Sequence, residues 1–273
     1  MSTEYAPGLH VVSGRAVDAS AYDRWVGRWS RLFVPSLLAA ARVSPGCAVL
    51  DVATGTGEAA VMALSAVGVS GIVVGTDIAP EMLQAARGRL NAPSFLTVAA
   101  DGQALPFGDA SFDAVVCQLG LQFFPDPSMG LREFRRVLRP GRRGAVCVIS
   151  APDRAPMFGV LAETLSKFVP ERRDLLYLSF ALADQEGLEG LFVDAGFGDV
   201  RVEREVRSDI IGSFDEYWAA IETGTGSQPQ TYLALAEADR RSVREAVKAG
   251  LARFESGGRL SMSIEMLIGS GCA

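Results

Sequence analysis

Short apolar runs alternate with amphipathic stretches through the first 150 residues of the chain. The runs are rich in Val, Ile and Phe, and they cover residues 47–52, 72–76, 95–99, 112–117 and 145–150. Strands of a parallel sheet are covered by helices on both faces, so their sequences are almost continuously apolar. Alternation with helical stretches is typical of βαβ units. The pattern therefore predicts a parallel sheet with helices between its strands.

The helical stretches between these runs carry local start and stop signals. A helix predicted over residues 80–90 begins with Pro80, and its apolar residues form one stripe. Asp126 or Ser128 is expected to cap the next helix, which ends before the Pro-Gly pair at 140–141.

After residue 151 the pattern changes toward helices with large apolar side chains. Ser213 and Glu216 have the spacing of a capping box, which opens a helix through Ile221. Strict alternation predicts a half-buried strand near the carboxyl end. The other predicted elements are helices at 156–169, 174–183 and 188–195, a strand at 199–207, a loop at 223–229, a helix carrying Val243, Val247, Leu251 and Phe254, and the last strand at 260–268.

Composition narrows the class of protein. Of the 273 residues, 49% are hydrophobic and 21% charged, which is typical of a globular chain. The net charge of −6 argues against binding along a nucleic-acid backbone. The four cysteines have no metal-ligand spacing, the first residues lack a signal-peptide pattern, and no apolar run is long enough for a membrane span. We therefore expect a cytoplasmic protein without a metal, a membrane span or a nucleic-acid partner, and either a monomer or a homodimer.

A glycine-rich turn follows the first apolar run, in the stretch VLDVATGTGEAA. Asp51 ends the run, and Gly55 and Gly57 make a turn where a ligand can approach the main chain. Gly55, Gly57 and Ala60 also satisfy the relaxed dinucleotide pattern, with Asp77 at the distance of a ribose-binding acid. A NAD-dependent oxidoreductase therefore remains an alternative on this motif alone.

A third acid argues against the NAD-dependent alternative. Asp101 and Gly102 come directly after the third run, so Asp51, Asp77 and Asp101 lie at the carboxyl ends of three successive predicted strands. Three acids there suit a ligand that has hydroxyls, an adenine amine and a cationic centre, and Asp101 has no obvious role in NAD binding.

On these stretches the chain resembles the class I S-adenosylmethionine-dependent methyltransferases, in the ubiquinone/menaquinone-type small-molecule branch. The matching stretches are VLDVATGTGE, VVGTDIAPEML, AADGQALPFGDASFDAVVCQLGLQFFPD and LREFRRVLRPG. The resemblance implies an α/β fold, a doubly wound seven-stranded mostly parallel sheet (Rossmann-like methyltransferase fold) with helical lid insertions, in which one of the last two strands is antiparallel. It also implies an N-terminal helical arm over the cofactor at residues 1–40, and a methyltransferase domain at 41–273 with lid helices at about 155–185 and 213–256.

The resemblance also implies a site for S-adenosyl-L-methionine. Residues expected at its methionyl part are Asp51, Ala53, Thr54, Gly55 and Gly57; at its ribose and adenine, Asp77, Ile78, Met82, Asp101, Gly102 and Gln103; and at its sulfonium and methyl group, Gln118 and Leu119. Ala53 stands where many relatives have glycine.

The segment AYDRWVGRWSRLF precedes this region. Tyr22 or Trp25 could lie near the sulfonium, because an aromatic face attracts a cation, and Arg28 could pair with the cofactor carboxylate. The alternative is an amphipathic helix that packs its aromatic residues onto the sheet. Six arginines between residues 132 and 143 are interpreted as the solvated face of a helix and a turn.

Methyl transfer from a sulfonium needs little covalent help, so positioning and exclusion of water can supply much of the rate. The only histidine is His10, so a histidine base in the pocket is not expected. We therefore expect an acidic nucleophile, which is a phenol, a carboxylic acid or a stabilised carbon acid, or a base supplied by Asp, Glu or Tyr. The expected reaction is methyl transfer to an oxygen or carbon of an apolar small molecule, such as a phenol, a quinone or a polyketide-like compound. No catalytic residue is assigned. A cofactor-binding protein with a non-methylating role remains the second alternative.

Overall fold

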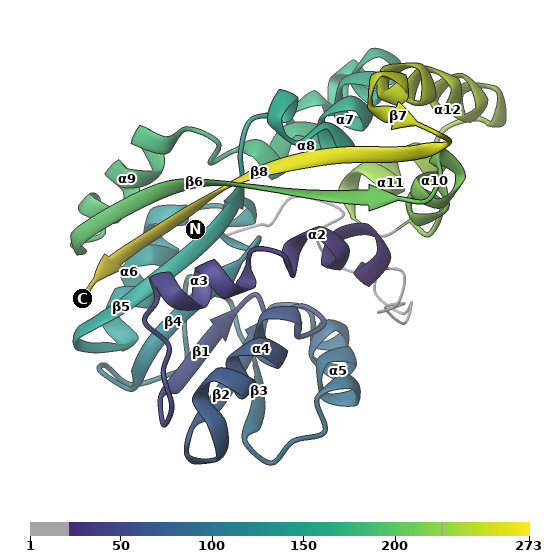
Figure 1. Ribbon diagram of the computed structural model, residues 1–273. Helices are drawn as coiled ribbons and strands as arrows, with labels where there is room; N and C mark the ends of the chain where they lie inside the picture. Colours follow the sequence, from purple (N-terminus) through teal and green to yellow (C-terminus); the bar gives the residue numbers. More distant parts are fainter. Residues whose placement is uncertain (1–21, 225) are drawn as a thin grey trace.

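The computed structural model describes residues 22–224 and 226–273. Its central sheet has the order β3-β2-β1-β4-β5-β8-β6, and β7 pairs with β8 at the side (Figure 1). The strands are β1 Ala48–Val52, β2 Ile72–Asp77, β3 Phe95–Ala99, β4 Phe112–Gln118, β5 Leu138–Ile149, β6 Gly198–Ile211, β7 Glu255–Ser256 and β8 Arg259–Cys272. The first five strands pair in parallel, and β8 is antiparallel to both β5 and β6. The predicted fold class is confirmed, and β7 is an additional short strand.

Helices cover both faces of this sheet. One face carries α3 Val34–Ala40, α4 Glu58–Val67 and α5 Pro80–Arg89, and the other carries α6 Pro127–Val137 and α9 Gln185–Asp194. Each layer encloses its own apolar cluster, in which Trp29 and Phe33 lie on one side and Phe134 and Phe192 on the other. Strands β1, β2 and β4 are therefore covered on both sides, which explains why their sequences are almost continuously apolar.

Two predicted caps are present. Asp126 is the residue that caps α6, because its carboxylate accepts a hydrogen bond from the backbone N–H of Met129. Ser213 caps α10, Phe214–Glu222, by accepting from the N–H of Glu216. The return bond of the capping box is displaced by one residue, because the Glu216 carboxylate accepts from the N–H of Gly212.

Two of the predicted elements, a loop and a helix, need correction. The loop predicted at 223–229 is wrong from Ser227 onward, where α11, Ser227–Leu233, begins. Ser227, Gln228 and Pro229 are buried in the structure, so tertiary packing overrides their turn-forming composition. The single helix predicted at 174–183 is α8, Arg173–Tyr177, followed by a 3-10 turn, η6, Leu178–Phe180.

Strands β6 and β8 extend beyond the rest of the sheet as a two-stranded ribbon. Pairing of β5 with β8 ends at Ile149 and Met266, whereas β6 and β8 remain paired as far as Ile211 and Leu260. The ribbon therefore projects past the carboxyl ends of the parallel strands, toward α10, α11 and α12 (Figure 1). The helices at this end are α7 Pro156–Phe168, α8, α10, α11 and α12 Glu237–Leu251. We refer to this group of helices as the lid layer.

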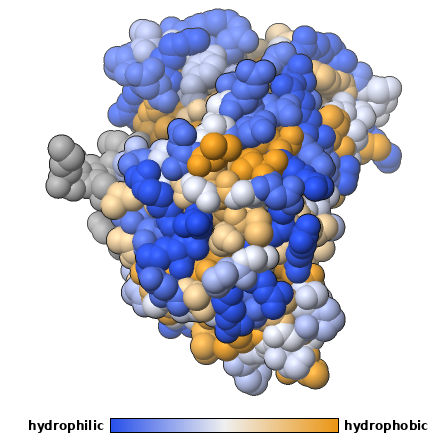
Figure 2. Space-filling model, turned by 90° about the vertical axis from the view of Figure 1, so that its left-hand side faces the viewer, coloured by the Kyte–Doolittle hydropathy of each residue, from blue (hydrophilic) through white to orange (hydrophobic). Residues whose placement is uncertain are grey.

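Hydrophilic residues dominate the face shown in Figure 2, and apolar residues form separate patches near its centre and at its lower edge. The exposed large apolar side chains of the described residues are scattered over several elements, for example Val69, Met129 and Val193. Within residues 22–224 and 226–273, no helix combines the length and apolarity that crossing a membrane requires.

Candidate functional site

The carboxyl edge of the sheet holds a cluster of left-handed backbone conformations. Ala53 follows β1 with a φ of 55°, and Leu119 follows the neighbouring β4 with a φ of 56°. Gly55 and Gly57 have φ values of 55° and 87°. Left-handed conformations of residues other than glycine are unfavourable and occur most often at functional sites. The φ of Ala53 also explains why glycine suits that position.

Asp51 lies at the end of β1 and is completely buried. Its Oδ2 accepts a hydrogen bond of 2.7 Å from the hydroxyl of Thr54, whereas Oδ1 has no partner within the described part of the chain. Burial raises the pKa of the Asp51 carboxyl to about 7, against the opposing effect of the Thr54 hydrogen bond, and the charge of Asp77 raises it further. Oδ1 is therefore a polar group that a ligand could satisfy.

Asp77 joins the glycine turn to the next helix. Its two carboxylate oxygens accept hydrogen bonds from the backbone N–H of Gly55 at 3.0 Å and of Ala79 at 2.9 Å. Burial raises the pKa of Asp77, although these bonds oppose the shift. Ile78 is 37% exposed beside it, and Met82 on α5 is half-buried. Each oxygen retains a lone pair for a second donor such as a ribose hydroxyl.

Asp101 and Gln103 form a compact polar loop after β3. Asp101 accepts a hydrogen bond of 2.8 Å from the backbone N–H of Gln103, and the Gln103 side-chain oxygen accepts from the N–H of Asp126. Gly102 packs against Phe124, whose ring would lie 2.3 Å from a Cβ at position 102. Because no side chain fits there, glycine is required for packing within the protein, in addition to any contact with a ligand.

The interpretation of the arginines of residues 132–143 as a solvated face holds for Arg132, Arg135, Arg139 and Arg142, which are exposed. It needs correction for Arg136 and Arg143. Arg136 donates to the carbonyls of Leu105 and Phe107 and pairs with Glu133 at 2.7 Å, so it holds the loop after Asp101 in place. Arg143 is 4% exposed and pairs with Asp199 at 2.6 Å. The remaining ion pairs of these arginines among the described residues are Arg132–Asp126, Arg136–Asp109, Arg139–Asp113 and Arg142–Asp113. Glu133 and Asp126 belong to α6 or its cap, whereas the partners at Leu105, Phe107, Asp113 and Asp199 lie on other segments, where a local pattern could not reveal them.

Buried polar atoms without a partner concentrate at the same edge. Gln118 donates from Nε2 to the carbonyl of Ser30 at 3.0 Å, but its Oε1 has no partner in the described residues. The same holds for Thr76 Oγ1, Asp51 Oδ1 and both side-chain polar atoms of Gln122. Buried polar groups are nearly always hydrogen-bonded in native proteins. A polar ligand bound across the ends of β1, β2 and β4 would supply these partners.

The segment that begins at Tyr22 lies against the glycine turn. A Cβ at Gly55 would be 3.9 Å from the Tyr22 hydroxyl, and burial together with the charge of Asp77 raises the pKa of Tyr22. Asp23 accepts a hydrogen bond of 3.1 Å from the Thr56 hydroxyl and pairs with Arg89 at 3.0 Å. Sequence reasoning missed Asp23, although it stands next to Tyr22 in the same motif.

Trp25 points to the lid layer. Its ring centroid lies 5.2 Å from that of Phe158 on α7 and 5.7 Å from that of Tyr217 on α10. Trp25 is therefore packed among aromatic side chains of α7 and α10, whereas the amphipathic-helix alternative expects its aromatic residues on the sheet.

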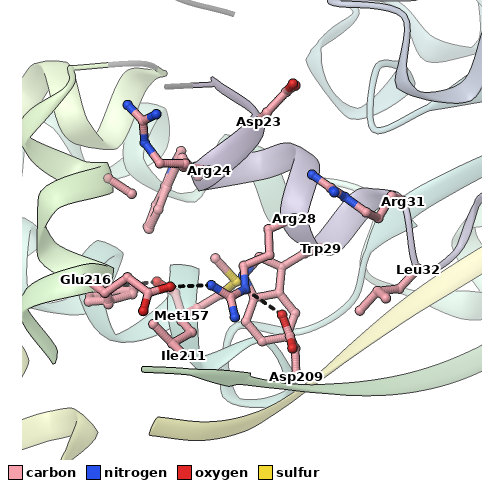
Figure 3. Close-up of a pocket in the computed structure, with 13 residues that line it drawn as sticks. Asp23, Arg24, Arg28, Trp29, Arg31, Leu32, Met157, Asp209, Ile211 and Glu216 are labelled. Atoms are coloured by element: carbon pink, nitrogen blue, oxygen red, sulfur yellow. Dashed lines mark hydrogen bonds and ion pairs between the residues drawn. The ribbon is translucent and has the colours of Figure 1, made fainter. Parts of the chain in front are cut away.

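Arg28 forms hydrogen bonds to the projecting ribbon and to α10 (Figure 3). Its guanidinium donates to Asp209 at 2.5 Å, to Glu216 at 2.7 Å and to the carbonyl of Ile210 at 2.5 Å. The sequence leads us to expect that Arg28 pairs with the cofactor carboxylate. In the structure all three of its guanidinium nitrogens instead donate to protein acceptors. His10 lies outside the described residues.

A cavity of about 440 Å³ separates the N-terminal segment from the lid layer. Its apolar lining includes Trp25, Trp29, Met157 and Tyr217, and Arg28 reaches across it (Figure 3). Pockets for small molecules commonly have this size and this mainly apolar lining.

Comparisons with known proteins agree with this geometry. Residues 50–146 match the family model described as a methyltransferase domain. The demethylmenaquinone methyltransferase of Staphylococcus epidermidis is 33% identical over 59% of this chain and 71% of its own length. A ubiquinone/menaquinone biosynthesis C-methyltransferase of Xanthomonas oryzae pv. oryzae is 36% identical over 62% of this chain and 71% of its own length. A proposed methyltransferase of Bacillus halodurans shares the fold, with a TM-score of 0.59 and 21% identity over 88% of this chain and 97% of its own.

The chain belongs to the class I S-adenosylmethionine-dependent methyltransferases, in the ubiquinone/menaquinone-type branch. It is an enzyme whose cofactor is S-adenosyl-L-methionine, which sets aside the NAD-dependent alternative.

The buried carboxyl of Asp51 predicts a specific pH dependence of stability. Because its pKa is raised from 3.8 to about 7, the folded state holds a proton that the unfolded state loses between these values. The free energy of unfolding therefore falls as the pH rises through this window. Between pH 5 and 7 the free energy of unfolding of the wild type should fall by about 2 kcal/mol more than that of Asp51→Asn. Urea unfolding at the two pH values measures this difference. Asp239→Asn, on the exposed surface of α12, is the control. Equal declines in the wild type and Asp51→Asn would contradict the assignment.

Arg28→Ala is expected to loosen the junction between the N-terminal segment and the lid layer. Loss of its bonds to Asp209 and Glu216 should speed amide exchange in residues 209–216 about fivefold, which corresponds to about 1 kcal/mol for a partly exposed pair. Hydrogen exchange followed by mass spectrometry measures this effect. Arg241→Ala removes an exposed pair with Glu237 on α12 and should leave the same peptide unchanged. Unaltered exchange in Arg28→Ala would show that the bridge does not hold the junction.

Proposed function

We propose that this methyltransferase acts on a carbon or oxygen of an apolar aromatic small molecule, with a hydroquinone as the favoured acceptor. The observation that carries the proposal is the aromatic character of the space above the carboxyl edge, where Trp25, Phe158 and Tyr217 pack together. A planar ring matches such surroundings, because aromatic side chains contribute large apolar contacts. The two relatives named above are called a demethylmenaquinone methyltransferase and a ubiquinone/menaquinone biosynthesis C-methyltransferase, which supports ring carbon as the methylated atom.

The proposed cofactor site follows the carboxyl edge of the sheet. Asp77 would accept hydrogen bonds from the ribose hydroxyls, and Asp101 would bind the adenine amine. The left-handed turns at Ala53 and Leu119 support close approach of the main chain to the methionyl part. The other residues proposed to line this site are Tyr22, Asp51, Thr54, Gly55, Gly57, Ile78, Met82, Gly102, Gln103 and Gln118.

The proposed arrangement has an arm and a lid. Residues 1–40 would cover the cofactor, and residues 41–273 would form the catalytic domain with lid helices at about 155–185 and 213–256. Support comes from the described part of the arm, in which Asp23 bonds to the glycine turn and Arg28 bonds to β6 and α10. One short segment thereby joins the two sides of the site, and it would exclude water from both.

When bound, the cofactor supplies a methyl group on a sulfonium, whose sulfur–carbon bond breaks with the electron pair left on sulfur. The protein's task is then to hold the acceptor in line and to keep water out. Burial raises the pKa of Tyr217, whose hydroxyl donates to the carbonyl of Met157 at 2.7 Å. Tyr22 and Tyr217 are therefore protonated at neutral pH and unsuited to accept a proton. This favours an acceptor whose ring carbon is nucleophilic before any proton is removed, such as a hydroquinone, because its hydroxyl oxygens donate electron density to the ring.

The proposal predicts methylation of 1,4-naphthalenediol, the reduced form of a simple naphthoquinone. Incubation with cofactor carrying a ¹³C-labelled methyl group should give a product with one added label, and carbon NMR distinguishes a ring-bound methyl from a methoxy group. Asp77→Ala should lose most of this turnover through weaker cofactor binding, whereas Asp239→Ala on exposed α12 should retain it. Labelling that is absent from quinols, phenols and polyketides, despite binding of S-adenosylhomocysteine, would contradict the proposed acceptor class.

A further inference from the structure

Gln122 has a buried side-chain amide whose nitrogen and oxygen both lack a partner in the described part of the chain. It lies in the 3-10 turn η3, Leu121–Phe123, directly after β4, and is 1% exposed. Neither Oε1 nor Nε2 has a hydrogen-bond partner in residues 22–224 and 226–273. An amide that is both buried and unpaired is uncommon, because water released on burial must be replaced by other partners. A ligand that supplies a donor and an acceptor would satisfy this amide.

The position of η3 connects Gln122 to the proposed methyl-donor end of the site. The chain turns sharply at Leu119, and Gly120 then packs against the end of β1, where an added Cβ would lie 2.5 Å from the Cβ of Ala53. Gln118, on the other side of this turn, is held by the carbonyl of Ser30. Gln122 is thus two residues after Gly120, which packs against Ala53 at the end of β1.

Another part of η3 lies near the lid layer, because it packs against η6, which carries Leu178 and Phe180 and itself contacts α8. The turn η3 also packs against β5 and α6. Gln122 consequently belongs to a turn between the carboxyl edge of the sheet and the apolar residues of η6. In such surroundings an oxygen of an apolar acceptor has few other polar groups to bind.

We infer that Gln122 binds the acceptor through the oxygen next to the methylated atom, an inference that rests on the proposed function. Its Nε2 would donate to a hydroxyl, phenolate or carbonyl oxygen of the ring, and Oε1 would accept from a second hydroxyl. A neutral amide orients such an oxygen without being a base. During transfer the bond from sulfur to the methyl carbon breaks with its electron pair staying on sulfur, and a bond from the acceptor carbon to the methyl group forms. The ring proton is then released to water.

Gln122→Leu tests the inference, because leucine has a similar size and no polar atoms. With 1,4-naphthalenediol as the probe, kcat/KM should fall about 10- to 100-fold, mainly through KM, since a lost hydrogen bond in a buried site has this magnitude. The dissociation constant of S-adenosylhomocysteine should stay within about twofold of the wild type. Gln122→Glu keeps an acceptor but loses the donor, so it should also raise KM.

Gln228→Leu is the matched control. Gln228 is also a buried glutamine with an unpaired Oε1, but it lies in α11, where its Nε2 bonds to the carbonyl of Leu176. This change should affect the urea midpoint and leave the KM for the diol unaltered. A Gln122→Leu enzyme with wild-type kinetics and raised stability would overturn the inference and identify Gln122 as an amide hydrated by water. A wild-type enzyme that binds S-adenosylhomocysteine but neither binds nor methylates the diol would overturn the proposed acceptor, and with it the role of Gln122.

Discussion

The pairing of β8 with both β5 and β6 is the constraint on which the arrangement of the site depends. Because β8 is antiparallel, its first half continues past the carboxyl end of β5 and carries β6 with it. The resulting ribbon brings Asp209 and Glu216 within reach of Arg28, whose own segment is fixed to the glycine turn by Asp23. A hydrogen-bond ladder at one end of the sheet thereby positions both the lid layer and the N-terminal segment over the strands that hold the acids.

Burial gives the carboxyl edge its chemical character. Burial raises the pKa of both Asp51 and Asp77, and the charge of Asp77 raises the pKa of Asp51 further. A buried charge is unfavourable unless it is paired or hydrogen-bonded, and Asp51 Oδ1 has no such partner in the described residues. A cationic ligand would favour the ionised forms. The polarity that destabilises this edge in isolation therefore suits it to a cofactor that carries a sulfonium and several hydrogen-bond donors.

Local sequence patterns account for the sheet and for two helix caps, because apolar runs and capping residues act within one element. The ribbon's length and α11 could not be predicted, since both depend on what packs against them. Arg28 shows the same limit, because its acceptors lie 181 and 188 residues away. The roles of the glycine turn and the acids came from family resemblance, whereas Gln122 carries no motif signal of its own. Its unpaired amide is visible only once the neighbouring atoms are known.

The most direct measurement is a calorimetric titration of S-adenosylhomocysteine into the wild type and Asp77→Ala. Asp77 holds the glycine turn and the start of α5 together and is proposed to bind the ribose. We expect tight binding to the wild type, binding weakened about 100-fold or more by Asp77→Ala, and no change in Asp239→Ala. Equal affinity of the wild type and Asp77→Ala would contradict a cofactor site at the carboxyl edge of the sheet.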